Sequence, residues 1–304
     1  MGNASLLDCA VNGRFYAEHD IHAIVLGVPR QCFESPNLAG VNMGPYYTAL
    51  GAAQYLERQG VTSLVGLTAK QPGAEYFIEG VGTFARSKGL KSVSLQETVP
   101  ITDGAGLALK LADAAGDGGG VVLAVTPPEA LKILQGAEQQ GLVDKVKWAC
   151  ATTCNDASVA KALGPAWDGK LGVNAELDLV DSNGPDSQLY RQVQSRYAPD
   201  VPLGSFGQMG FVEARIATQA LLDIEGGDYT QKTVNEAFRA VDDFRTDLLC
   251  KPWYFGTGDT HVPNNTDRTI VPAGDSFVQK EDCSEIAALP GNHLAEIRSA
   301  EQAE

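Results

Sequence analysis

Short runs of branched apolar residues alternate with helical patterns through the first two thirds of the chain. Each run is too short for a helix and ends at a turn signal or a polar loop, so each is predicted to be a β-strand. Strands separated by helices at this spacing form βαβ units, which predicts an α/β fold with a parallel sheet and helices on both faces. The predicted strands are 23–26, 63–67, 92–95, 121–125, 146–150 and 171–177.

Between and after these runs, apolar residues recur at helical spacing. Several of the predicted helices begin at a proline and end at a glycine. Beyond residue 251 a Gly/Pro-rich stretch with short β pieces at 253–255, 269–271 and 276–278 predicts a small ribbon. The predicted helices are 5–17, 45–59, 72–88, 127–140, 157–163, 185–197, 207–224, 230–241 and 294–303.

The beginning of the chain departs from the βα pattern. Ser5 is predicted to cap the first helix, and no strand is predicted before it. A parallel sheet built from βα units needs a strand before each helix. We therefore expect the chain to begin partway through a domain, with an incomplete first lobe.

Composition limits the function classes. The 304 residues are 44% apolar, enough for a large core, and the length is one at which chains divide into two lobes. The net charge of −15 would repel phosphate backbones, so nucleic acid is not an expected partner. The sequence has no apolar run of about 20 residues and no basic segment followed by an apolar one at its start. We expect neither a membrane span nor a signal segment in this chain.

The six cysteines occur without a CxxC pair, so a structural zinc site has little support. Six cysteines allow 15 pairings. Their sequential grouping suggests disulfides between Cys9 and Cys32, Cys150 and Cys154, and Cys250 and Cys283. The alternative is six reduced, buried thiols, because cysteine is often simply buried.

Searches for catalytic motifs fail. The chain has no nucleophile elbow, no Walker loop and no HExxH pair. Residues 80–85 fit a dinucleotide-binding pattern, but they lie inside a predicted helix, where close helix packing explains the glycines better. The sequence therefore predicts neither an enzyme nor a cofactor or metal site.

Polar and small residues collect where predicted strands end and helices begin. Ligands of open α/β sheets bind outside the carboxyl ends of the strands, and free N–H groups at helix starts attract carboxylates. The alternative is that these residues only cap helices. The segments concerned are 3–5, 27–30, 70–73, 126–127 and 152–155.

Four segments, taken in order, resemble one known family. They are Phe-Tyr-Ala-Glu-His-Asp-Ile at 15–21 before the strand at 23–27, Gly-Pro-Tyr at 44–46 leading into the helix through 51–56, Gly-Gln-Met-Gly-Phe at 207–211, and Phe-Arg-Thr-Asp at 244–247. Their order and spacing are similar to those of periplasmic binding proteins of the branched-chain amino acid type, the solute receptors of ABC importers. The resemblance covers nearly the whole chain.

This resemblance implies a type I, two-lobed fold with three hinge crossings, each lobe a mainly parallel sheet with helices on both faces. It places the first lobe at 1–43 and 178–249, the second at 44–177 and 250–282, and a C-terminal tail at 283–304. It also implies an exported protein, in the periplasm or lipid-anchored at the outer face of the membrane. Its partners would be a small ligand, such as an amino acid or another carboxylate, and the membrane subunits of an ABC importer.

The resemblance also places the ligand in the cleft between the lobes. Arg30 and Val28 stand where the family has threonine and alanine, and a guanidinium fork suits a carboxylate. Thr152 and Thr153 stand where the family pairs an acidic residue with an amino group, so the ligand need not be an α-amino acid. The expected ligand-binding residues are Asn3, Ser5, Gly27, Val28, Arg30, Gln71, Gly73, Tyr76, Thr126, Thr152, Thr153 and Gln208.

Two other functions fit the same architecture. The effector-binding domain of a transcription repressor would come with a helix-turn-helix and a basic surface, and the sequence shows neither. An α/β enzyme using the inter-lobe cleft would need a perturbed acid–base pair there, and the sequence offers few titratable groups at those positions.

Overall fold

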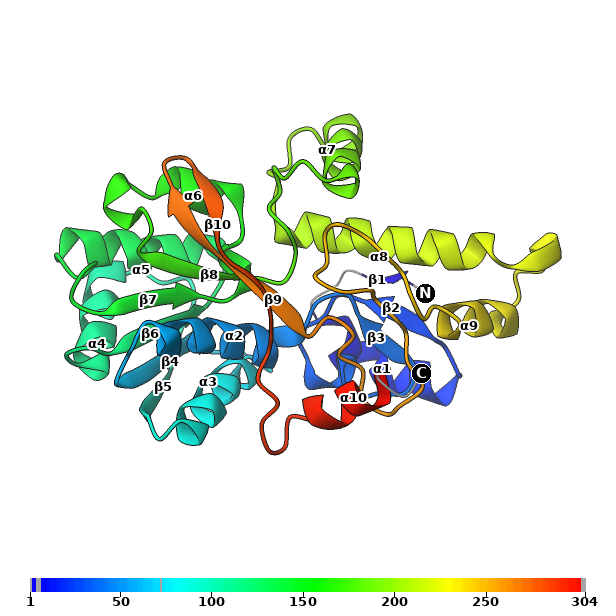
Figure 1. The fold of residues 1–304 in the computed structure, drawn as a ribbon, viewed down its shortest axis with the longest axis horizontal. Helices are drawn as coiled ribbons and strands as arrows, with labels where there is room; N and C mark the ends of the chain where they lie inside the picture. Colours follow the sequence, from blue (N-terminus) through cyan, green and yellow to red (C-terminus); the bar gives the residue numbers. More distant parts are fainter. Residues whose placement is uncertain (1, 4–6, 72, 302–304) are drawn as a thin grey trace.

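The computed structural model describes residues 2–3, 7–71 and 73–301, and it shows two lobes side by side (Figure 1). The first lobe contains a three-stranded sheet, and the second a seven-stranded sheet with the order β10-β9-β8-β7-β6-β4-β5. Helices pack on both sheets (Figure 1). This arrangement confirms the predicted two-lobed α/β fold.

The sheet of the first lobe has the strand order β1-β2-β3, and all its pairs are parallel. Its strands are β1 (Gly2–Asn3), β2 (Ala23–Val25) and β3 (Leu38–Gly40). Because β1 pairs with β2, the expectation that no strand precedes the first helix is wrong. β1 consists of a glycine and an asparagine, so it offers no apolar run from which a strand could be recognised.

Helices cover both faces of this small sheet. Side chains alternate along β2, so Ala23 and Val25 share one core with Tyr16, whereas Ile24 shares another with Met209. The first helix begins at Asp8 without a side-chain cap, and Ser5, its expected cap, lies outside the described residues. The helices of this lobe are α1 (Asp8–Glu18), α7 (Pro185–Tyr197), α8 (Ser205–Leu222) and α9 (Gln231–Arg239), with a 3-10 turn η1 (Arg30–Cys32) after β2.

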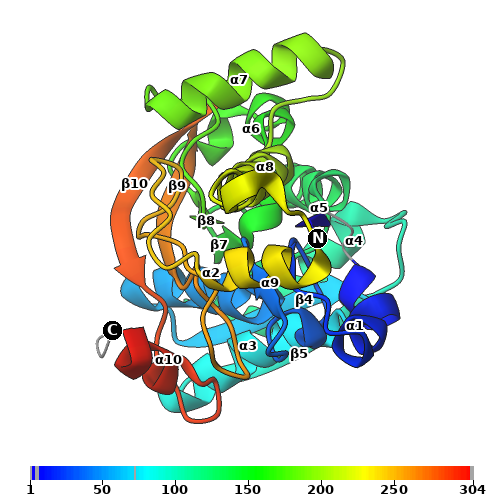
Figure 2. The same cartoon turned by 90° about the vertical axis from the view of Figure 1, so that its right-hand side faces the viewer.

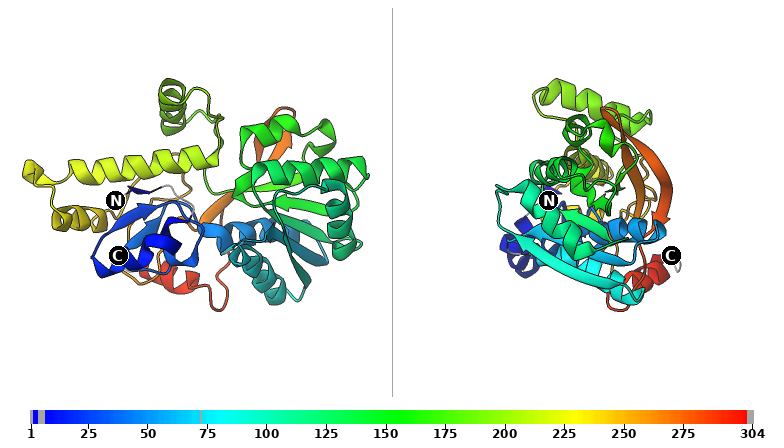
Figure 3. Two further views of the ribbon diagram at one scale, coloured as in Figure 1. Left: turned by 180° about the vertical axis from the view of Figure 1, so that it is seen from behind. Right: turned by 90° about the vertical axis from the view of Figure 1, so that its left-hand side faces the viewer.

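The sheet of the second lobe is parallel except at one edge. The predicted ribbon is a longer hairpin of β9 and β10, which joins the sheet antiparallel to β8. The right-hand panel of Figure 3 shows β10 (orange) curving along one side of the lobe. The strands are β4 (Ser63–Ala69), β5 (Lys91–Glu97), β6 (Gly120–Ala124), β7 (Lys147–Cys150), β8 (Leu171–Ala175), β9 (Thr266–Ala273) and β10 (Ser276–Glu285).

The helices of the second lobe include one that is buried along most of its length. α2 packs against β6, β7, β8 and α3, and apolar contact on several sides explains its burial. Gly80 of α3 lies against the Tyr46 carbonyl of α2, which confirms helix packing for this glycine, whereas Gly82 meets only the side chain of Arg86 in its own helix. One helix of this lobe, α4, was not predicted from the sequence. The helices are α2 (Gly44–Arg58), α3 (Glu75–Ser87), α4 (Gly104–Ala115), α5 (Pro127–Gln139) and α6 (Ala157–Ala162), with the 3-10 turns η2 (Thr152–Cys154) and η3 (Pro165–Trp167).

The chain passes between the two lobes after β3, after β8 and before β9. Trp253 and Phe255, which precede the last passage, pack in the core of the first lobe together with Ile24. A final helix, α10 (Leu294–Glu301), then packs beside the junction (Figure 1), at the opposite side of the view from α1 in Figure 2. It is anchored by buried Leu294 and by an ion pair of 2.7 Å between Lys251 Nζ and Glu301 Oε1.

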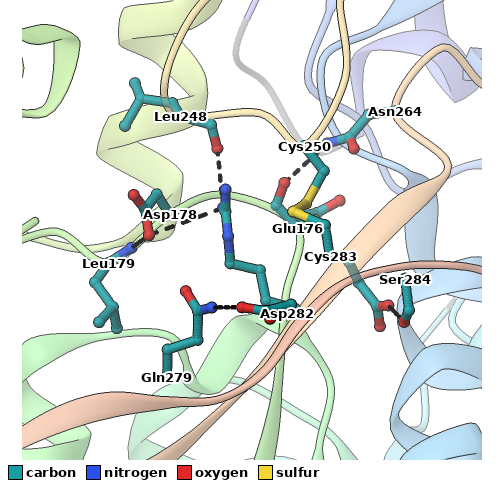
Figure 4. The surroundings of a disulfide bond; sticks show 12 residues. Glu176, Asp178, Leu179, Leu248, Cys250, Asn264, Gln279, Asp282, Cys283 and Ser284 are labelled. Atoms are coloured by element: carbon teal, nitrogen blue, oxygen red, sulfur yellow. Dashed lines mark hydrogen bonds and ion pairs between the residues drawn. A yellow bond between two sulfur atoms is a disulfide. The ribbon is translucent and has the colours of Figure 1, made fainter. Parts of the chain in front are cut away.

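Three disulfides join the cysteines in the order expected from their grouping, so the alternative of reduced thiols is wrong. Cys9–Cys32 ties α1 to η1, and Cys150–Cys154 ties the end of β7 to η2. Cys250–Cys283 ties the loop that follows Leu249 to β10, beside the passages between the lobes (Figure 4). Each pair closes a segment of 4 to 33 residues.

Candidate functional site

The carboxyl ends of the strands in the second lobe face the junction between the lobes. The start of α2, where the first crossing enters this lobe, marks that edge. The Thr152 N–H, just after β7, donates to Thr48 Oγ1 of α2 over 2.8 Å. The Met43 N–H at the start of α2 donates over 2.5 Å to Glu176 Oε2, which follows β8. Because neighbouring strands β4, β6, β7 and β8 are parallel, the loops after them share this edge.

The expected site residues of the second lobe lie in these loops. Gln71 and Gly73 follow β4, Thr126 follows β6, and Thr153 follows β7. The Thr153 hydroxyl donates to the Val125 carbonyl over 2.7 Å and so joins two of the loops. Gly73 has a φ of +82° and open space where a side chain would stand.

Residues of the first lobe that follow β2 reach the same junction. The Arg30 guanidinium contacts Glu79 Oε2 at 2.7 Å and lies 4.5 Å from the centre of the Tyr76 ring. Arg30 belongs to η1 of the first lobe, whereas Glu79 and Tyr76 belong to α3 of the second. The structure therefore brings Arg30 and Tyr76 together across the junction.

The electrostatics of this contact are those of a half-exposed surface. Burial by itself lowers the pKa of Arg30, but the hydrogen bond and charge of Glu79 outweigh it and leave that pKa raised. The side chains of Arg30 and Glu79 are 47% and 49% exposed, so their ion pair stabilises the contact between the lobes only weakly. Burial raises the pKa of Tyr76, which stays a neutral ring beneath the guanidinium.

Two other expected residues are used by the fold itself. The N–H of Gly27 donates to Asn42 Oδ1 and its carbonyl accepts from Asn42 Nδ2, so both backbone groups are occupied. A side chain at Gly27 would also collide with the sulfur of Cys32. Val28 packs half-buried against the core. Ser5 lies outside the described residues, as does the side chain of Asn3.

The start of α8 joins the site from the first lobe. The Ser205 hydroxyl donates to the Thr152 carbonyl over 3.2 Å, and the Ser205 N–H donates to the Asn155 carbonyl over 3.0 Å. Gln208 is buried one turn later, and its Nε2 donates to the Asp178 carbonyl over 3.0 Å. Ser205 therefore ties α8 to the loop after β7, and Gln208 ties α8 to the second crossing.

A buried polar network at the crossings was not predicted. Asn264 Nδ2 donates to the carbonyls of Val41 and Glu176 over 3.1 and 3.3 Å, so one side chain joins all three passages between the lobes. Figure 4 shows Asn264 and Glu176 beside the Cys250–Cys283 disulfide. Burial raises the pKa of Glu176 to about 8, although the hydrogen bond from the Met43 backbone by itself lowers that pKa.

The same network continues into the hairpin. Thr48 Oγ1 donates to Asn174 Oδ1 over 2.9 Å, Asn174 Nδ2 donates to Asp267 Oδ2, and Ser284 Oγ donates to Asp267 Oδ1 over 3.0 Å. Burial raises the pKa of Asp267 to about 7. A polar residue inside an otherwise apolar strand, Asn174 of β8, was the sequence signal that could have revealed it.

The site offers hydroxyls, backbone groups, an arginine and aromatic rings. Within residues 2–3, 7–71 and 73–301, no cluster of three or more His, Cys, Asp or Glu side chains is arranged to hold a metal ion. None of the helices in these ranges is long and apolar enough to cross a bilayer. Such a set of groups suits the binding of a small solute by hydrogen bonds, charge and ring contacts.

Comparisons with known proteins identify the family of this chain and relatives with the same fold. The sequence profile of a family described as periplasmic binding protein matches residues 1–271. No curated protein matches the chain. Among solved structures, a branched-chain amino acid ABC transporter protein from Thermus thermophilus with bound valine superposes with a TM-score of 0.79 at 18% identity, covering 91% of this chain and 75% of that one.

Two further solved structures show the same fold. A fatty acid ABC transporter substrate-binding protein from Thermomonospora curvata gives a TM-score of 0.78 at 16% identity, covering 91% of this chain and 72% of that one. A solute-binding protein of an ABC transporter from R. palustris in complex with benzoate gives a TM-score of 0.72 at 17% identity, covering 91% of this chain and 75% of that one.

Proposed function

Because this chain belongs to the periplasmic binding protein family, we propose that it is the solute-binding receptor of an ABC importer and holds a small ligand between its lobes. The observation that carries the proposal is the Arg30–Tyr76 contact across the junction, where loops from both sheets meet. The first lobe would comprise 1–43 and 178–249 and the second 44–177 and 266–282. Residues 250–265 would stay with the first lobe as far as Phe255, because Trp253 and Phe255 pack in its core, and would then lead into the third crossing.

The groups at the junction favour a ligand with a carboxylate. Arg30 supplies a cation with a planar fork, and the ring of Tyr76 offers a face for an apolar or aromatic ligand body. Thr152 and Thr153 supply no negative charge for an ammonium group. Solved relatives hold valine or benzoate, and this set of side chains fits benzoate better than valine.

Binding would act by hinge closure. A ligand touching both lobes favours the closed state through contacts that the open state lacks. In the present conformation Glu79 occupies the Arg30 guanidinium, so a carboxylate ligand would compete with Glu79 for it. Membrane subunits of the importer would then recognise the closed form.

The protein would work outside the cytoplasm, in the periplasm or attached to the outer face of the membrane. Three disulfides support this location, because such bonds persist in oxidising compartments. We further propose that the ligand is released unchanged, so the protein would not be an enzyme.

Calorimetry with benzoate, valine and leucine tests the proposal. We expect benzoate to bind in a saturable manner and Arg30→Ala to weaken that binding about tenfold or more, as loss of a charge-assisted hydrogen bond does. Arg196→Ala, a change on the exposed end of α7, is the matched control and should bind benzoate normally.

Two measurements complete this test. Small-angle scattering should show a smaller radius of gyration with ligand, and mass spectrometry should recover the ligand unaltered. Tight leucine binding without benzoate binding would refute the carboxylate preference. Chemical conversion of a bound ligand would favour the alternative of an enzyme that uses the same junction.

A further inference from the structure

The sheet of the second lobe ends in an edge strand that is open along its length. Among the strands that the structure describes, β5 pairs only with β4, and the two run in unbroken register from Lys91 to Glu97. Figure 1 shows β5 at the border of the lobe, below β4. A strand without a second neighbour presents unpaired N–H and C=O groups, to which another strand can add.

The pairing with β4 identifies the backbone groups on the open edge. The Lys70 N–H donates to the Glu97 carbonyl over 2.8 Å, so Glu97 directs its backbone groups toward β4. This direction alternates along a strand, so Ser92, Ser94 and Gln96 direct theirs away from the sheet. All three of these residues are exposed. The edge therefore offers backbone donors and acceptors at alternate residues, within reach of a partner.

The opposite edge of the same sheet is protected in a way that β5 is not. β10, at that edge, pairs with β9 through two register shifts, and its Cys283 is tied to Cys250. Bulges of this kind hinder the addition of a further strand. β5 contains neither a proline nor a shift in register. Its backbone is therefore regular enough to pair.

The sequence of β5 is complementary to itself when two copies run antiparallel. With Ser94 of one copy opposite Ser94 of the other, Lys91 lies opposite Glu97 and Val93 opposite Leu95, each pair occurring twice by symmetry. Directly opposite residues share a face of the sheet and can contact each other. Centring the pairing on Val93 or Leu95 instead would leave Lys91 without an acidic residue of β5 opposite it.

The charged ends of β5 are available for such a contact. Neither Lys91 nor Glu97 forms an ion pair with another residue that the structure describes. Glu97 Oε1 accepts from the Thr98 N–H over 3.1 Å, which leaves its other oxygen for a cation. Val93 is 40% exposed, and Leu95 of a second copy would cover it.

We propose that two copies of this chain associate through antiparallel pairing of β5, centred on Ser94, so that one sheet continues across both second lobes. None of the expected ligand-binding residues belongs to β5, and the association does not depend on the ligand proposed for the junction. It extends the proposed receptor by a partner that is a second copy of itself.

The association is expected to be weak. One pair of short strands covers less than the roughly 1,200 to 2,000 Å² of a stable interface, so the dissociation constant should be on the order of 100 μM. The net charge of −15 also makes two copies repel each other. At about 150 mM NaCl the Debye length is about 8 Å, so this repulsion is screened more strongly than the contact between Lys91 and Glu97.

Sedimentation velocity of the full chain at this salt concentration, from low micromolar to several hundred micromolar protein, tests the proposal. We expect a reversible equilibrium between monomer and dimer. Hydrogen exchange at the N–H groups of Ser92, Ser94 and Gln96 should slow as the protein concentration rises. Lys91→Glu and Glu97→Lys each place like charges opposite each other twice, so each should raise the dissociation constant about fivefold or more.

An equimolar mixture of these two variants is the sharpest test of the register. In the mixed dimer both contacts again join opposite charges, and the total charge equals that of two wild-type copies. The mixture should therefore dimerise about as well as the wild type, although each variant alone does so poorly. A mixture that associates no better than either variant alone would overturn the proposal.

Lys161→Glu is the matched control. It makes the same change of charge at an exposed position of α6, which packs beside β10 at the other edge of the sheet. This variant should dimerise like the wild type. A monomer at every concentration, an unchanged dimer in Lys91→Glu, or equal weakening by Lys161→Glu would each contradict pairing through β5. Benzoate binding by the same variants reports separately on the junction.

Discussion

Replacing Glu176 with glutamine should remove much of the pH dependence of stability between about pH 5 and 8. The Glu176 side chain is fully buried, and the Met43 N–H donates to its Oε2 over 2.5 Å. Burial raises its pKa from an ordinary 4.5 to about 8. The folded protein therefore keeps a proton on this carboxyl through a pH range in which the unfolded chain has released it.

The sign and size of the effect follow from this difference. Where the folded state binds one more proton than the unfolded state, the free energy of unfolding falls as pH rises, by up to roughly 1.4 kcal/mol per pH unit. The contribution of Glu176 is thus complete below about pH 4.5 and is lost as pH rises toward 8. Glutamine keeps an oxygen for the Met43 N–H and does not titrate. The variant should therefore gain stability relative to the wild type as pH rises, by a few kcal/mol in all.

Urea denaturation of both proteins at pH 5, 6, 7 and 8 measures this difference. Burial raises the pKa of Asp267 to about 7. Asp267 titrates in both proteins, so its contribution to the pH dependence of stability largely cancels when the two are compared. Glu225→Gln, at an exposed position, is the control and should follow the wild type at every pH. A stability difference between Glu176→Gln and the wild type that stays constant from pH 5 to 8 would refute the reasoning.

Three further changes test the fold. Replacing Cys250 and Cys283 with serine opens a loop with a sequence separation of 33, so chemical denaturation should show a loss of roughly 3 to 4 kcal/mol, and an unchanged midpoint would contradict it. Gly80→Ala places a methyl group against the Tyr46 carbonyl, so the melting temperature should fall by several degrees, whereas Gly210→Ala, in open space within α8, should raise it slightly because alanine favours a helix over glycine. Trp253→Phe removes a 2.9 Å hydrogen bond from Nε1 to a backbone carbonyl of β3, so unfolding should need about 1 to 3 kcal/mol less, and a loss below 0.3 kcal/mol would count against that bond.

The elements best predicted from sequence are those whose pattern is long and local. The predicted helix at 185–197 coincides with α7, because a proline starts it and its apolar spacing continues to its end. β1 and β3 were missed because their residues, Gly-Asn and Leu-Ala-Gly, contain no run of branched apolar residues like the one that revealed β2. α4 was missed although Asp103 caps it, because its first turn reads Gly-Ala-Gly, which is typical of a loop.

Sequence by itself determined the α/β class, the acidic surface and the loops at which a ligand could meet helix starts, because each depends on neighbours within a few residues. Only the tertiary structure decided which groups those loops place together. Arg30 meets Tyr76 because loops at the strand ends of both sheets face the same junction, and Asn264 joins Val41 to Glu176 because the three crossings lie side by side there. The raised pKa of Glu176 has the same origin, since burial depends on what packs around a residue and not on its neighbours in sequence.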